Sequence, residues 1–147
     1  MPGLRVVLDT NVLVYARDDL EPEKQPVAQG WLEHLWSSGG GRTGIQVLNE
    51  FYVTVTRNVR QPMAPEAARS EIADLAGWEP VGIDGDLVAA AWEVEDRYGF
   101  HFWDALVVAA AQRAGCDTLL TEDLQDGQDL DGVLVVNPFL HPPPEPD

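Results

Sequence analysis

The feature that most constrains the fold is a buried helix followed at once by a buried strand, within residues 100–127. Small and aliphatic residues follow Asp104 and continue to Gly115, a pattern that predicts a core helix ended by a glycine, with Asp104 in its first turn. Residues 116–121 then form the short apolar run typical of a buried parallel strand, and Asp123 follows them. Ligands of open α/β sheets bind along the carboxyl ends of the strands, so Asp104 and Asp123 can meet there.

Two further apolar runs predict strands of the same sheet. Residues 4–8 end at Asp9, and residues 132–136 form the last apolar run of the chain. Because these strands alternate with helical patterns, we predict an α/β/α sandwich with a central, mainly parallel sheet. The length of 147 residues suits one domain, which we expect to cover residues 1–140 and to be followed by a proline-rich, disordered tail at 141–147.

Charge and cysteine content exclude several classes of protein. Lysine and arginine number 9 against 25 acidic residues, so the net charge of −16 excludes a broad basic surface for nucleic acid. The single cysteine, Cys116, excludes a disulfide framework. Asp9 and Asn11 interrupt the amino-terminal apolar residues before a signal peptide or membrane span can form. We therefore expect a soluble, cytoplasmic protein that makes no membrane contact.

Four acids stand where apolar runs begin, end or are interrupted: Asp9, Glu50, Asp104 and Asp123. Singly, each has a structural explanation, since Asp9 can cap the next helix and Glu50 can be a solvated residue of a helix predicted at about 45–60. Together they repel one another, by about 4 kcal/mol for two charges roughly 4 Å apart at an effective dielectric near 20. Such a cluster requires a cation.

The residue types favour a hard divalent ion. Oxygen ligands with few histidines and no paired cysteines fit Mg²⁺ or Mn²⁺ and not a structural zinc site. Because Mg²⁺ commonly keeps water ligands and binds substrate phosphate, phosphodiester hydrolysis is the expected chemistry.

Five blocks, in order along the chain, resemble the PIN domains of VapC-type toxin ribonucleases. They are VVLDTNVLVYA at 6–16, QVLNEFYVTVTR at 46–57, FWDALVVAAA at 102–111, LLTEDLQDG at 119–127 and VVNPF at 135–139. The resemblance implies a metal-dependent endoribonuclease that cuts RNA with Mg²⁺ or Mn²⁺, forms a homodimer and binds a VapB-like antitoxin. The catalytic residues that it implies are Asp9, Glu50, Asp104 and Asp123, of which Asp9, Asp104 and Asp123 are metal ligands, with Asn11 and Thr121 in support.

Other polar residues near these blocks are open to two interpretations. Arg57 and Arg60 follow Glu50 on the predicted helix and either contact RNA phosphate or form a solvated face. His101 stands where a small hydroxyl residue would cap the Asp104 helix more effectively. Asp126 and Gln128 lie in a turn whose composition explains them structurally, so we leave them outside the core site.

Two other functions are compatible with an α/β fold that carries acids at strand ends. One is a catalytically silent PIN-like module that binds RNA or protein, a function usually marked by missing acids, whereas all four are present. The other is a phosphoaspartyl phosphatase or receiver, which needs a lysine near the phosphoryl group. The only lysine, Lys24, falls in a segment predicted as a polar loop, and Asn11 stands where the phosphatase motif has its second aspartate.

Overall fold

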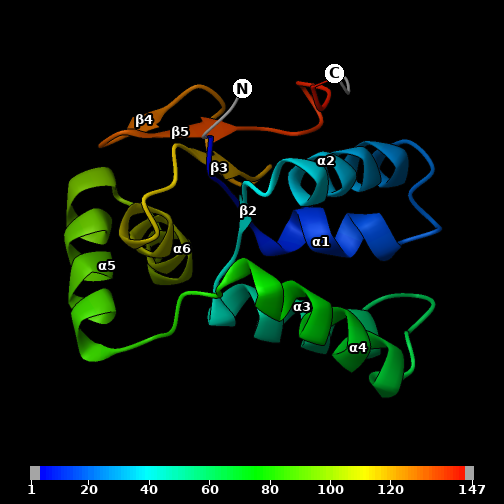
Figure 1. The fold of residues 1–147 in the computed structure, drawn as a ribbon. Helices are drawn as coiled ribbons and strands as arrows, with labels where there is room; N and C mark the ends of the chain where they lie inside the picture. Colours follow the sequence, from blue (N-terminus) through cyan, green and yellow to red (C-terminus); the bar gives the residue numbers. More distant parts are fainter. Residues whose placement is uncertain (1–3, 145–147) are drawn as a thin grey trace.

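A five-stranded sheet forms the centre of the protein in the computed structural model, which describes residues 4–144 (Figure 1). The strands are β1 (Val6–Leu8), β2 (Gly41–Arg42), β3 (Thr118–Leu120), β4 (Asp129–Leu130) and β5 (Val133–Val136). Their order is β2-β1-β3-β5-β4, and every neighbouring pair is parallel except β4 with β5. The predicted α/β fold with a mainly parallel sheet is confirmed.

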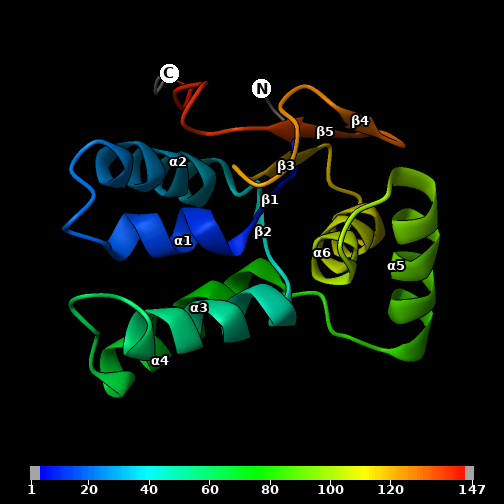
Figure 2. The same cartoon turned by 180° about the vertical axis from the view of Figure 1, so that it is seen from behind.

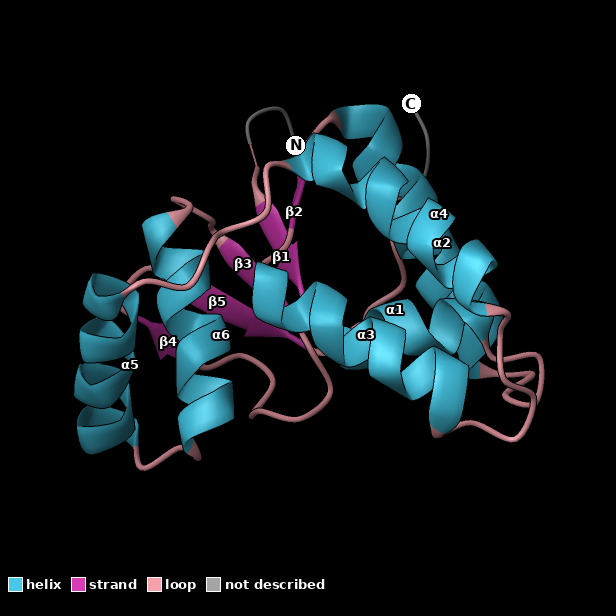
Figure 3. Ribbon diagram, turned by 90° about the horizontal axis from the view of Figure 1, so that it is seen from below, coloured by secondary structure: helices cyan, strands magenta, loops and turns pink. Residues whose placement is uncertain are grey.

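Six α-helices cover this sheet: α1 (Thr10–Arg17), α2 (Lys24–Ser38), α3 (Ile45–Arg57), α4 (Pro65–Leu75), α5 (Gly85–Tyr98) and α6 (Phe102–Arg113). Figures 1 and 2 show α5 and α6 together on one side of the strands and α1 with α2 on the other. The first turn of α3 lies beside α6 (Figure 3), where the side chain of Gln46 donates a hydrogen bond to the backbone oxygen of Trp103. This contact joins the two helices that carry Glu50 and Asp104.

Helix α6 is the core helix that the sequence predicts. Every residue from Ala105 to Ala111 is buried, and Gly115 follows the helix with a φ of 67°, which a residue without a Cβ adopts readily. Because many of its side chains are alanines, α5 packs closely against it through the buried Leu87, Ala91 and Val94. The first turn of α6 is thereby held rigidly at the edge of the sheet.

The register of β1 and β3 places two polar residues side by side. Leu8 pairs with Leu120, both are fully buried, and the amide of Asp9 donates to the carbonyl of Leu120 at 3.0 Å. A slip of one residue would carry Asp9 into the apolar core, so burial fixes the register. Asp9 and Thr121, the first residues beyond the two strands, therefore lie next to each other.

Several element boundaries differ from those predicted. Helix α3 ends at Arg57, so Arg60 lies beyond it, and Ile45, predicted on the buried face, is 40% exposed. Helix α2 begins at Lys24, inside a segment predicted as a loop. Strands β2 and β4 were missed because two residues are too few to show a period.

The carboxyl-terminal segment lies on α2. Trp31 donates its indole N–H to the carbonyl of His141 at 3.1 Å, and His141 contacts Asp126 at 2.9 Å. Residues 145–147 of the predicted tail lie outside the described residues, and the disorder of that tail stays a prediction. No helix between residues 4 and 144 is both long and apolar enough to span a bilayer.

Candidate metal centre

Three of the four predicted acids form one cluster. One carboxylate oxygen from each of Asp9, Asp104 and Asp123 lies within 4.8 Å of the others. The three residues come from the end of β1, the first turn of α6 and the loop after β3, so they meet at the carboxyl edge of the sheet. Asp9 is buried, Asp104 half-buried and Asp123 exposed. The cluster therefore opens to solvent on the side of Asp123.

Asp9 is the most enclosed of the three acids, with 6% of its surface exposed. Its two oxygens accept hydrogen bonds from the amide of Thr10 at 2.7 Å and from the hydroxyl of Thr121 at 2.8 Å. Burial raises the pKa of Asp9 to about 6, because desolvation and the nearby charges of Asp123 and Asp104 outweigh these hydrogen bonds. Asp9 is also the N-cap of α1, so the capping role that the sequence allowed is confirmed, and its role as a metal ligand stays a prediction.

Asn11 and Thr121, predicted as supporting residues, connect the acids. The amide nitrogen of Asn11 lies 3.1 Å from the Asp123 carboxylate, 3.2 Å from the Thr121 hydroxyl and 3.5 Å from the Asp9 carboxylate. The hydroxyl of Thr121 also accepts from the amide of Asp123 at 3.1 Å. Both side chains therefore fix Asp9 and Asp123 relative to each other.

Asp104 has a raised pKa, caused first by burial and then by the charge of Asp123, with a smaller contribution from Glu50. His101, the N-cap residue of α6, lowers that pKa and makes no side-chain capping hydrogen bond, in agreement with its prediction as a poor cap. The side chain of Gln46 contacts both the Glu50 carboxylate and the carbonyl of Trp103, the residue before Asp104, so Glu50 lies near the first turn of α6.

Glu50 itself is not one of the three grouped acids. Its two oxygens accept hydrogen bonds from the hydroxyl of Thr10 and from the side-chain amide of Gln46, each at 2.8 Å. Sequence reasoning missed both donors. Gln46 stands four residues before Glu50, which places the two on one helix face, and that spacing was the available signal.

A second contact missed in the sequence holds the loop that carries Asp123. Lys24 lies 2.9 Å from one carboxylate oxygen of Glu122, and the hydroxyl of Tyr15 donates to the other at 2.7 Å. The ammonium also lies over the rings of Tyr15 and Phe139. No local pattern predicts a pair that is 98 residues apart in the chain. The only lysine is thus committed to Glu122, which weighs further against a phosphoaspartyl site.

The remaining predicted residues lie outside the cluster. Arg57, the last residue of α3, and Arg60 are exposed, and neither forms an ion pair within residues 4–144. Asp126 accepts from the amide of Asn137 at 2.9 Å and contacts His141, so it anchors the carboxyl-terminal segment. The carbonyl of Gln128 accepts from the amide of Val135, which is a structural contact.

The donor set fits a hard divalent cation. All three grouped ligand atoms are carboxylate oxygens, the donors that Mg²⁺ and Mn²⁺ prefer. Burial is the first cause that raises the pKa values of Asp9 and Asp104, and the charge of the neighbouring Asp123 raises both further. In addition, the buried Oδ1 of Asn11 has no hydrogen-bond partner among the described residues, which leaves an acceptor for a water ligand.

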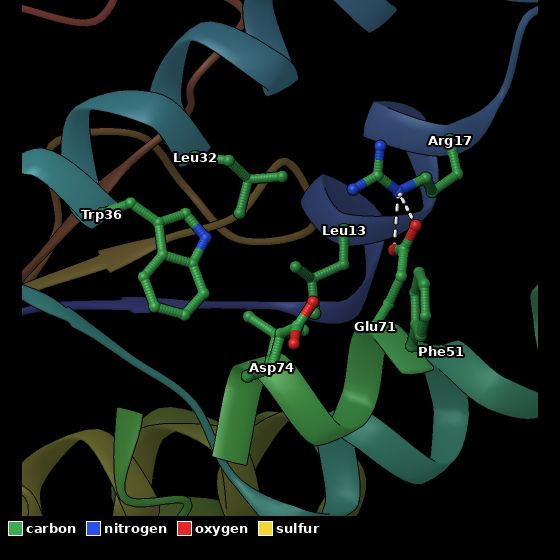
Figure 4. Close-up of a pocket in the computed structure, with 8 residues that line it drawn as sticks. Leu13, Arg17, Leu32, Trp36, Phe51, Glu71 and Asp74 are labelled. Atoms are coloured by element: carbon green, nitrogen blue, oxygen red, sulfur yellow. Dashed lines mark hydrogen bonds and ion pairs between the residues drawn. The ribbon is translucent and has the colours of Figure 1, made fainter. Parts of the chain in front are cut away.

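A cavity of about 410 Å³ lies between α1, α2, α3 and α4 (Figure 4). Arg17 and Glu71 form an ion pair of 2.6 Å at one side of it, and Trp36 stands at the other. Its lining residues are Leu13, Arg17, Leu32, Trp36, Phe51, Glu71, Asp74 and Leu75. None of them belongs to the acid cluster, so the cavity and the cluster are separate features.

A comparison with protein-family models finds a match to the PIN domain over residues 6–125. A search of curated protein sequences finds no match.

Solved structures of a toxin and of toxin-antitoxin complexes share this fold. A toxin-antitoxin complex from Klebsiella pneumoniae matches with a TM-score of 0.64 at 18% identity, over 90% of this chain and 97% of the other. VapC20 of Mycobacterium tuberculosis, a toxin that cleaves the sarcin-ricin loop, gives 0.58 at 22% identity, over 78% and 86% of the two chains. DNA-bound VapBC of Salmonella typhimurium gives 0.61 at 14% identity, over 90% and 96%. At these identities the likeness shows the fold.

Proposed function

This chain belongs to the PIN-domain family, whose model it matches over residues 6–125, and on that premise we propose that it is a metal-dependent endoribonuclease of the VapC toxin type. The observation that carries the proposal is the meeting of Asp9, Asp104 and Asp123 within 4.8 Å from three separate elements. Carboxylates held so closely repel one another, and a divalent cation offsets that repulsion. A silent binding module has no need of such a cluster.

Each residue of the cluster has a distinct part in the proposed hydrolysis. A bound Mg²⁺ or Mn²⁺ supplies Lewis acidity toward the scissile phosphate. Asp9, Asp104 and Asp123 provide its ligand oxygens, and Asn11 with Thr121 keeps Asp9 and Asp123 in place. Glu50 is held by hydrogen bonds from Thr10 and Gln46, and its carboxylate would accept a proton from the attacking water.

Cleavage of single-stranded RNA tests this function. We expect the purified protein to cut a labelled RNA with Mg²⁺ or Mn²⁺ and to stop when EDTA removes the ion. The Asp104→Asn variant should lose at least about a hundredfold in rate, because it lacks one ligand charge. Asp96→Asn removes the same charge from the exposed face of α5 and should cut like the wild type. Equal rates in the two variants would remove the cluster from the reaction.

The proposal includes two protein partners. A VapB-like antitoxin would cover the cluster and place an arginine among the carboxylates, since a guanidinium can bridge two of them and replace the charge of the cation. Toxin-antitoxin complexes among the similar structures support this partner. A homodimer is also proposed by analogy with the toxin family, and light scattering that gives the mass of one chain would contradict it.

A further inference from the structure

An exposed tryptophan adjoins the acid cluster. Trp103 directly precedes Asp104 in the first turn of α6, and 61% of its surface is exposed. The other four tryptophans range from 4% exposed at Trp78 to 55% at Trp92. Trp103 is thus the most exposed of the five, and it is the one next to a proposed metal ligand.

The backbone of Trp103 is held in place although its ring is open to solvent. The side-chain amide of Gln46 donates to the carbonyl of Trp103 at 3.1 Å and to Glu50 at 2.8 Å, so one side chain ties Trp103 to the acids. The ring of Phe102 packs edge-on against the indole, with ring centroids 5.1 Å apart. An indole with a fixed base and an exposed ring is a suitable stacking surface, because little conformational entropy remains to be lost on binding.

The indole lies within reach of a substrate bound at the cluster. Adjacent Cα atoms are about 3.8 Å apart, so Trp103 and Asp104 start from neighbouring points of one helical turn. Neighbouring side chains of a helix point in different directions, but both lean toward the amino-terminal end of α6, so the indole lies on the same turn as the Asp104 carboxylate. A nucleotide next to the scissile phosphate is therefore close enough to place its base on the ring.

The charge of the protein favours such a surface. With a net charge of −16, the protein has no general attraction for phosphate. A bound cation provides charge only at the scissile position. Base stacking on an aromatic ring contributes roughly 1–3 kcal/mol per base and depends little on ionic strength, so it can hold a single strand where phosphate contacts are few.

We propose that Trp103 is a base-binding residue that stacks an unpaired nucleobase beside the acid cluster. This inference rests on the proposed nuclease function and adds the way in which the substrate is held. A base within a duplex is not free to stack on the ring, so the nucleotide bound at Trp103 has to be unpaired.

Binding in the inactive Asp104→Asn background tests the proposal without relying on cleavage. The probe is a fluorescein-labelled 12-nucleotide oligoadenylate with Mn²⁺, followed by anisotropy, beside an abasic ribose-phosphate chain of equal length. We expect Trp103→Ala to weaken oligoadenylate binding about tenfold and Trp103→Phe by less than about threefold, with binding of the abasic chain unchanged. Trp92→Ala, a change at a similarly exposed tryptophan of α5, should bind like its parent.

Three results would overturn the proposal. The first is an equal affinity of Trp103→Ala and its parent for oligoadenylate. The second is an equal loss of affinity for the abasic chain and for oligoadenylate. The third is that Trp103→Ala forms a smaller oligomer in light scattering and that this change accounts for the weaker binding. The last would assign the indole to a contact between copies of the chain.

In the active protein, Trp103→Ala should raise KM about tenfold with kcat unchanged, since stacking is equal in the ground and transition states. If the wild type cuts no RNA, the nuclease function is contradicted, whereas the binding measurement still tests whether Trp103 stacks a base.

Discussion

The buried carboxylate of Asp9 makes the stability of the metal-free protein depend on pH in a predictable direction. Its pKa is raised from 3.8 in the unfolded chain to about 6 in the folded protein, mainly by burial. The folded form therefore binds this proton more tightly than the unfolded chain does. Protonation of Asp9 raises the free energy of unfolding by its full amount below pH 3.8, and this stabilisation is lost as pH rises through about 6. At 1.36 kcal/mol per pKa unit the difference is about 3 kcal/mol, which corresponds to roughly 6–12 °C in Tm for a domain of this size.

Thermal unfolding of the wild type and of Asp9→Asn, in EDTA and between pH 4 and 8, measures this effect. Asp104, whose pKa burial also raises, is common to both proteins, whereas hydrogen bonds lower the pKa values of Asp84 and Asp126 and keep them out of this range. At pH 4 part of this effect is already absent, so we expect the Tm of the wild type to fall by about 5–10 °C relative to that of Asp9→Asn as pH rises from 4 to 8. A constant offset from changed contacts with Thr121 does not affect this slope. Parallel curves across the range would refute the burial of an ionising Asp9.

Three further predictions concern the cluster and its ligands. Metal-free Asp104→Asn should gain on the order of 1 kcal/mol in unfolding free energy, since one repulsive charge is removed, and a loss in urea denaturation would count against repulsion. RNA binding by that variant should depend weakly on salt: if Arg57 and Arg60 each contact one phosphate, the slope of log affinity against log salt concentration is near −1.4. The double variant Arg57→Ala/Arg60→Ala should make this slope shallower, and an unchanged slope would show that neither arginine contacts RNA. The complex with the antitoxin should bind Mn²⁺ far more weakly than the free protein, and undiminished binding in calorimetry would rule out an arginine among the acids.

The parts of the fold that follow from local patterns were predictable. The apolar run of α6, its terminal Gly115 and the strand before Asp123 carry period and termination signals within a few residues. Because the position of an acid at a helix start or strand end follows from those elements, the meeting of Asp104 with Asp9 and Asp123 was predictable as well.

The contacts that hold the site together were not predictable from local patterns. Thr10 binds Glu50 and Lys24 binds Glu122 across 40 and 98 residues, and their geometry depends on the packing of α1 against α3 and α2. The end of α3 at Arg57 was also missed, because the apolar pattern continues to Val59. Arg57 therefore lies roughly 10 Å along the helix axis from Glu50, whereas Arg60, predicted on the same helix, lies beyond its end.

Anomalous diffraction from crystals grown with Mn²⁺ at pH 7.5 tests most directly whether three acids from three elements form one cation site. We expect a strong anomalous peak in contact with carboxylate oxygens of Asp9, Asp104 and Asp123, and a weaker peak in Asp104→Asn, which keeps two of the three carboxylates. A map without density at this cluster, or with its main peak at another acidic pair such as Glu71 and Asp74, would contradict the metal centre and the hydrolysis built on it.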